Sequence, residues 1–151
     1  MSNFNEILFK TSVLSMCIDG ELQSEEMEFF KSFSKGNTYF SEFVVEKKFR
    51  SVVDGIRFDL NGFIEGLTED VRESDLEKQY ILIILDVVIA LIQSDDKVDQ
   101  NEVFLLRKLL DIFNLDREFL LGRYPDLSDA LMQPEAKMEE RSFDDIVIEY
   151  D

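Results

Sequence analysis

The sequence predicts an all-α protein of about seven helices, in which two pseudo-symmetric helical hairpins pack in one bundle. Three observations support this fold class. Apolar residues recur at helical spacing along most of the chain, and no alternating strand pattern occurs before residue 143. Both prolines, Pro125 and Pro134, lie near the C-terminus, so no earlier segment is barred from forming a helix. A helix–loop–helix unit near the N-terminus also recurs later in the chain, and hairpins of this kind must share a core.

Four helices are expected in the first half of the chain. The first covers residues 3–18, with Glu6 as the capping partner of its first residue. After an Asp-Gly loop, a second helix ends at Gly36, since Gly is typical of the position that follows a helix. The third lies within residues 40–58, and the fourth, weakened by two glycines, covers residues 59–73. Their inward positions are Phe4, Ile7, Leu8, Thr11, Leu14, Ser15, Ile18, Met27, Phe29, Phe30, Phe33, Phe49, Val52, Val53 and Ile56.

Three further helices are expected after residue 74. The fifth covers Asp75 to Gln93 and is apolar nearly all round, which predicts a buried central helix. The sixth runs from about Asp99 to Phe113. A short seventh begins near Asp116, which caps it. Their inward positions include Val103, Leu106, Leu109, Leu110, Phe113, Phe119 and Leu120.

The most apolar run, residues 80–92, does not predict a membrane span. It is shorter than the roughly 20 residues that cross a bilayer, and Asp86 interrupts it. Asp86 corresponds to Lys10 in the repeat, so the two could form an ion pair. Alternatively, Asp86 marks a wetted face of the helix, because buried ion pairs give little net stability. Both interpretations stay open.

Composition excludes several classes of function. The net charge of −17 disfavours nucleic acid and anionic membrane surfaces as partners, because both require cationic residues. The chain has no His, the commonest general base, and one Cys, so an ordinary zinc site cannot be built. Cys17 lies among apolar residues and is interpreted as a core residue. No signal peptide is recognised at the N-terminus, and a cytoplasmic protein is expected.

The repeated loops read IDGELQSEE over residues 18–26 and SDDKVDQNE over residues 94–102. Each has the outline of the last part of a calcium-binding EF-hand loop. The first and third ligand positions of the first copy would be Ser15 and Cys17, and in the second copy Asp96 replaces the turn-forming glycine. Each copy therefore supplies at most about half of the 6–8 oxygen ligands that calcium takes. The EF-hand interpretation fails on ligand count.

Helix caps explain the same residues better. Gly20 can adopt a positive φ and end the first helix. Asp99 and Glu102 form a capping box at the start of the sixth helix, and residues 23–26 form the same box with a poorer cap residue. A second role remains open, because grouped acids can hold a hydrated divalent cation weakly if the two loops come together. The candidate ligands are Asp19, Glu26, Asp95, Asp96, Asp99 and Glu102.

The C-terminal residues 128–151 form an acidic tail that ends in FDDIVIEYD. One hypothesis is a docking motif that adds to the sheet edge or basic groove of a partner. The other is a disordered tail with incidental apolar residues. The candidate partner-binding residues are Phe143, Ile146, Ile148 and Tyr150, beside Val147.

A family resemblance rests on the duplicated pattern. Asp-Gly-x-apolar-x-x-x-Glu after a helix, a second copy over residues 85–115 and YPDL at residues 124–127 resemble the TerB-like, tellurite-resistance-associated family. The resemblance covers about residues 5–127, which we expect to form the domain 1–127, and departs from the family pattern at Asp96. It implies a helical bundle without catalytic activity in the bacterial cytoplasm. It also implies a role in stress response, metal resistance or phage defence, often beside membrane partners, and divalent-cation binding at Asp19, Glu26, Asp95 and Glu102.

The leading hypothesis from the sequence is a non-enzymatic, acidic interaction module that binds protein partners. The runner-up is a sensor of calcium, magnesium or manganese that uses the two loops. An enzyme is poorly supported, because the sequence offers no nucleophile with a base and no phosphate-binding Gly-rich loop.

Overall fold

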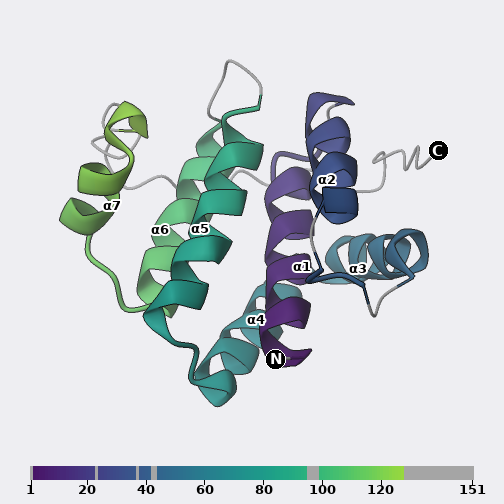
Figure 1. The fold of residues 1–151 in the computed structure, drawn as a ribbon, viewed down its shortest axis with the longest axis horizontal. Coiled ribbons are helices and arrows are strands. Elements are labelled where there is room, and N and C mark those ends of the chain that lie inside the picture. The colour runs from purple at the N-terminus through teal and green to yellow at the C-terminus, as the bar shows by residue number, and fades with distance from the viewer. Residues whose placement is uncertain (1, 23, 37, 42–43, 95–98, 128–151) are drawn as a thin grey trace.

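The computed structural model of the protein describes residues 2–22, 24–36, 38–41, 44–94 and 99–127. This part of the chain is an all-helical bundle without strands, as predicted (Figure 1). No helix in it is long and apolar enough to cross a membrane. Its elements are α1 (Ser2–Cys17), α2 (Ser24–Gly36), α3 (Val45–Phe58), α4 (Leu60–Ser74), α5 (Lys78–Ile92), α6 (Gln100–Ile112), α7 (Arg117–Arg123) and the 3-10 turn η1 (Pro125–Leu127).

Helix α1 is enclosed on most of its sides, because α3, α4 and α5 all pack against it. Its buried face includes three hydroxyl side chains, those of Thr11, Ser12 and Ser15. They donate to the carbonyl oxygens of Ile7 at 2.7 Å, Leu8 at 2.7 Å and Ser12 at 2.8 Å, respectively. These bonds satisfy the hydroxyls within the helix, so the polar residues can be buried without external partners.

Helix α5 is less central than its apolar sequence predicts. Its C-terminal half is buried, from Ile84 to Ile92, except at Asp86 and Ala90. Residues 80–83 are only half-buried. An apolar sequence shows that a helix tends to be buried, but it does not show how many neighbours will cover it. Here α3 and α4 pack on α1 rather than on α5.

An aromatic cluster joins the first three helices. Phe9 of α1 packs edge-on against Phe30 of α2 at 5.5 Å and against Phe40 at 4.9 Å between ring centroids. Phe30 also packs against Phe49 of α3 at 5.5 Å. All four rings are at most 2% exposed. Offset and edge-to-face pairs of this kind add about 0.5–1.5 kcal/mol each to the stability that burial supplies.

The predicted cap at the start of α1 is wrong. The helix already begins at Ser2, and Glu6 does not cap Asn3. Instead, the Glu6 carboxylate accepts from Lys48 Nζ of α3 at 2.7–2.8 Å and lies 3.6 Å from Lys10 Nζ. A cap needs only neighbours in sequence, whereas this ion pair depends on how α1 and α3 pack. The cap predicted for α7 is confirmed, since Asp116 accepts from the amide of Phe119 at 2.7 Å.

Candidate functional site

The first acidic loop is a tight turn at the end of α1. Gly20 has a φ of 89°, and its amide donates to the carbonyl oxygen of Cys17 at 2.9 Å. The Asp19 carboxylate accepts from the amide of Glu21 at 3.0 Å. The predicted helix-ending turn is confirmed, because Gly adopts a positive φ without the steric cost of a Cβ. Asp19 is thus already engaged in holding the backbone of the turn.

The predicted capping box at the start of α6 is also confirmed. The Asp99 carboxylate accepts from the amide of Asn101 at 2.9 Å. The Glu102 carboxylate accepts from the amide of Asp99 at 2.8 Å, and Glu102 is only 3% exposed. Two backbone donors that α6 itself cannot satisfy therefore find acceptors, an arrangement worth on the order of 1 kcal/mol.

One buried hydrogen bond connects the two loop regions. The amide nitrogen Nδ2 of Asn101, in the first turn of α6, donates to the carbonyl oxygen of Ile18, just after α1, at 2.9 Å. Asn101 is fully buried. Helices α1 and α5 also pack side by side, and their C-terminal ends lie at the same end of the bundle (Figure 1).

Sequence reasoning missed Asn101, although one signal was available. Asn101 lies one turn before Leu105 and two turns before Leu109, on the apolar stripe of α6. A polar side chain at such a position must find a partner in the core, because an unsatisfied buried amide is costly.

Glu26 and Cys17 are both buried next to the first loop. Glu26, the counterpart of Glu102 in the repeat, is 2% exposed in the first turn of α2. Burial raises the pKa of the Cys17 thiol, and the nearby Glu26 and Asp19 carboxylates add to that effect. The thiol is therefore protonated at neutral pH and has little nucleophilic character. The interpretation of Cys17 as a core residue is confirmed.

The candidate cation ligands are only partly covered by the structure. Asp19, Asp99 and Glu102 have the local roles described above. Among the described residues, no group of three or more Asp, Glu, Cys or His side chains is arranged to hold a metal ion. Asp95 and Asp96 lie outside the described residues, so cation binding by the loops stays a prediction. The candidate tail residues also lie outside the described residues: Phe143, Ile146, Ile148 and Tyr150.

Asp86 forms a polar cluster between α5 and the end of α7. Both its carboxylate oxygens accept from Arg123, at 3.2 Å from Nε and 2.9 Å from Nη2, and the Tyr124 hydroxyl bonds to the same carboxylate. Partial burial acts to raise the pKa of Asp86, but the hydrogen bonds from Arg123 and Tyr124 outweigh it, so the pKa lies below its usual value. Burial, followed by the bond to Asp86, raises the pKa of Tyr124 to about 12.

The proposed pairing of Asp86 with Lys10 is wrong. Lys10 Nζ instead lies 3.2 Å from Asp70 of α4, as well as close to Glu6 in its own helix. The Asp86 side chain is 47% exposed, which agrees with the alternative of a wetted helix face. The cluster attaches the short α7 to α5, and Lys78 of α5 adds a cation–π contact with Phe119 at 5.1 Å.

A polar groove between α4 and α6, with a volume of about 680 Å³, is a second feature that the sequence did not predict. Gly66 opens onto free space, because a Cβ built there meets no atom within 4 Å. Arg72 is paired with Glu69 at 3.2 Å, and the Thr68 hydroxyl donates to the carbonyl oxygen of Ile64 at 2.9 Å. Arg72 and Glu69 thus pair with each other, whereas the Thr68 hydroxyl bonds to the backbone of its own helix and not to a side chain that could act as its base.

Fold and site together define a class: an all-helical bundle in which a buried hydrogen bond joins the turn after α1 to the capped start of α6. In comparisons with known proteins, the chain matches no family model, no curated protein and no solved structure. The resemblance to the TerB-like family therefore stays a prediction.

Proposed function

We propose that this chain is a non-enzymatic, acidic interaction module whose loop end binds a basic surface of a protein partner. The observation that carries the proposal is the buried bond between Asn101 and Ile18, which holds the two acidic loop regions at one end of the bundle. The side chains that form caps and turns there are held in place. Glu21 and Glu25 are exposed beside them, at positions that a partner can contact.

The charge of the chain supports a basic partner. With a net charge of −17, the protein attracts cationic surfaces over distances of about a Debye length, roughly 8 Å at physiological salt. Complementary charges of this kind raise the rate and specificity of association. On the TerB-like resemblance, the proposed setting is a bacterial stress-response, tellurite- or metal-resistance, or phage-defence system, with scaffolding as the role.

Charge reversal at the loop end tests this proposal. The double variant E21K/E25K should lose a protein that the unchanged chain captures from cells of its source, identified by mass spectrometry. The matched control is E69K/E73K, which makes the same change of charge at exposed positions of α4 and should retain that protein. Capture should also weaken as salt rises. A set of captured proteins that is identical for all three chains would refute the loop end as the binding surface.

A divalent-cation sensor is the second candidate, and the same bond between Asn101 and Ile18 favours it, because cation binding needs carboxylates from both loops near one another. Calorimetry with calcium, magnesium and manganese tests it. An ion present at about 100 times its Kd should stabilise the fold by about 2.7 kcal/mol. The control is sodium chloride at matched ionic strength, and D95N/D96N should abolish a specific effect. The absence of both heat and a melting shift at millimolar ion would refute the sensor.

A further inference from the structure

Helix α3 differs from the rest of this acidic chain in its charge. It carries four of the 16 Lys and Arg residues but only two of the 33 acids, which makes it the most basic of the seven described helices. Arg50 pairs with Glu46 one turn earlier at 3.3 Å, an exposed pair of little energetic worth. Lys47 forms no ion pair with any residue that the structure describes.

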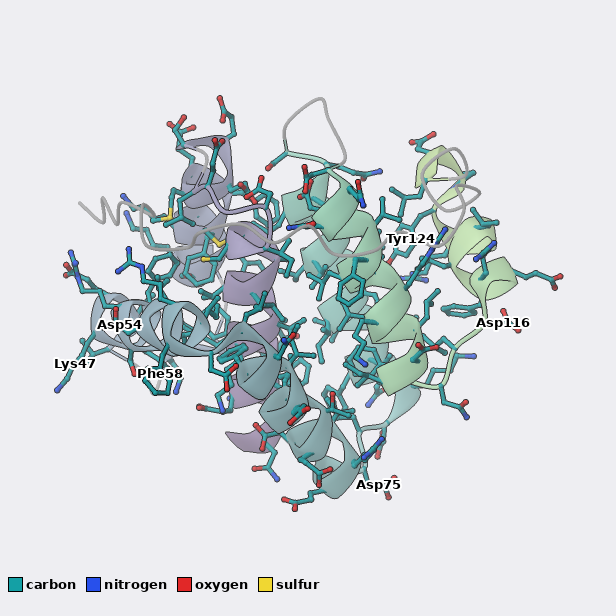
Figure 2. The ribbon with its side chains drawn as sticks, turned by 180° about the vertical axis from the view of Figure 1, so that it is seen from behind. Lys47, Asp54, Phe58, Asp75, Asp116 and Tyr124 are labelled. Carbon is teal, nitrogen blue, oxygen red and sulfur yellow. The ribbon has the colours of Figure 1, made fainter. Side chains whose placement is uncertain are left out.

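The outward face of α3 is also unusually apolar at its two ends. Val44, Lys47, Ser51, Asp54 and Phe58 fall within about 80° of one another around the helix axis, on the side opposite the buried residues. Phe58 is 91% exposed and Val44 is 72% exposed, and they are the large hydrophobic residues exposed in the described part of the chain. Figure 2 shows Lys47, Asp54 and Phe58 on the outer side of α3, away from the rest of the bundle.

A helix face that carries a nearly fully exposed Phe at one end and an unpaired Lys near the other fits a partner with acidic and apolar side chains. The C-terminal segment of this chain, FDDIVIEYD over residues 143–151, has that composition. It holds four acids and no basic residue, with apolar side chains at Phe143, Ile146, Val147, Ile148 and Tyr150.

We propose that the outward face of α3 is the docking surface for this chain's own C-terminal segment, residues 143–151. The acids of the segment face Lys47 and Arg50, and its apolar residues cover Phe58 and Val44. The described structure ends at Leu127, and the linker of residues 128–142 can span up to about 50 Å when extended. A domain of this size has a radius of gyration of about 14 Å, so the segment can reach α3 of the same molecule.

This inference is independent of the proposed function, which uses the loop end and a separate protein. Docking within one molecule would cover Phe58 and hold the acidic segment against the helix that repels it least. A tether of about 15 residues provides an effective concentration on the order of 1 mM, so a segment with a free-peptide Kd of about 0.1 mM would be docked about 90% of the time.

A fluorescence experiment on the full chain tests the proposal. The chain contains no Trp, so Phe58→Trp is a single reporter at an exposed position. Acrylamide should quench this reporter several-fold more strongly when the tail carries I146S/I148S than when the tail is native. The matched control, Arg117→Trp at an exposed position of α7, should be quenched equally with either tail. Circular dichroism and urea midpoints verify that each chain is folded.

A charge exchange makes the test specific. K47E/R50E in the reporter chain should increase quenching with the native tail, and D144K/D145K added to that chain should reduce it again. The proposal is overturned if quenching of the Phe58→Trp chain is the same with both tails. It is also overturned if the difference disappears on dilution, because the segment would then dock on a second copy.

Discussion

The hydrogen bond between Asn101 and Ile18 makes a quantitative prediction about stability. Asn101→Ala removes the side-chain amide that donates to the Ile18 carbonyl oxygen at 2.9 Å, at a fully buried position. Leaving a buried acceptor unsatisfied costs about 1–3 kcal/mol, and the lost side-chain atoms leave a small void as well. We expect a loss of about 2–3 kcal/mol, enough to lower the Tm by roughly 5–10 °C in a chain of this size.

Urea unfolding followed by far-UV circular dichroism measures the change. The matched control is Glu25→Ala, at the exposed position that corresponds to Asn101 in the first loop, and it should change the stability by less than about 0.5 kcal/mol. A loss for Asn101→Ala no larger than that of the control would refute the reasoning, because the bond would then contribute nothing to joining the loops.

Asn101→Asp adds a pH dependence to this prediction. The new carboxylate would be buried and would face a carbonyl oxygen, so its folded pKa should be raised above the unfolded value of about 3.9. The destabilisation should therefore be full at neutral pH and should be relieved as the pH falls through the raised folded pKa, when the protonated acid can donate to Ile18. An equal loss of stability at pH 4 and pH 7 would contradict this role of the side chain as a donor.

Three further predictions concern other parts of the bundle. The pKa of Asp86 is lowered in the folded state, so its partners on α7 stabilise the fold above the unfolded pKa of about 3.9, and this contribution is lost as the pH falls through the folded pKa. D86N should thus cost less than about 1 kcal/mol at pH 7 and less again at pH 2–3, measured from urea midpoints. A cost that is constant with pH would contradict this. The Cys17 thiol should react with a thiol reagent only on unfolding, and rapid reaction of the native chain would contradict its burial. Gly66→Ala should stabilise the protein by up to about 1 kcal/mol in thermal or urea unfolding. Gly62→Ala should not, because its Cβ would lie 2.4 Å from the Asp59 carboxylate that caps α4. Equal gains in stability for the two variants would refute this role of Asp59.

Features that depend on neighbours in sequence could be predicted well. The helices follow from apolar spacing, and the turn at Gly20 and the capping box of Asp99 and Glu102 use residues at most three positions apart. The apolar positions predicted to face inward are buried in α3 and α6, although Phe29 and Phe33 of α2 are only partly covered. Such patterns are readable because the 3.6-residue period and the caps act within one or two turns.

Partner choice between distant helices could not be predicted in the same way. Glu6 was expected to cap its own helix and instead pairs with Lys48, while Asp86 was compared with Lys10 and instead binds Arg123. An acidic chain offers many alternative ion pairs of similar energy. Which of them forms depends on the approach of whole helices, to which each exposed pair contributes little.

The sequence by itself determined the all-α class, the duplicated hairpin and the caps at its loops, because these rest on local periodicity and on hydrogen bonds within a turn. Only the tertiary structure decided that α1 rather than α5 is enclosed most completely, that Asn101 joins the two loop regions and that α3 presents Phe58 to the outside. Each of these depends on contacts between residues far apart in the chain. The apolar face of a helix can be recognised in the sequence, but the helix that covers this face is determined only by the packing of the whole bundle.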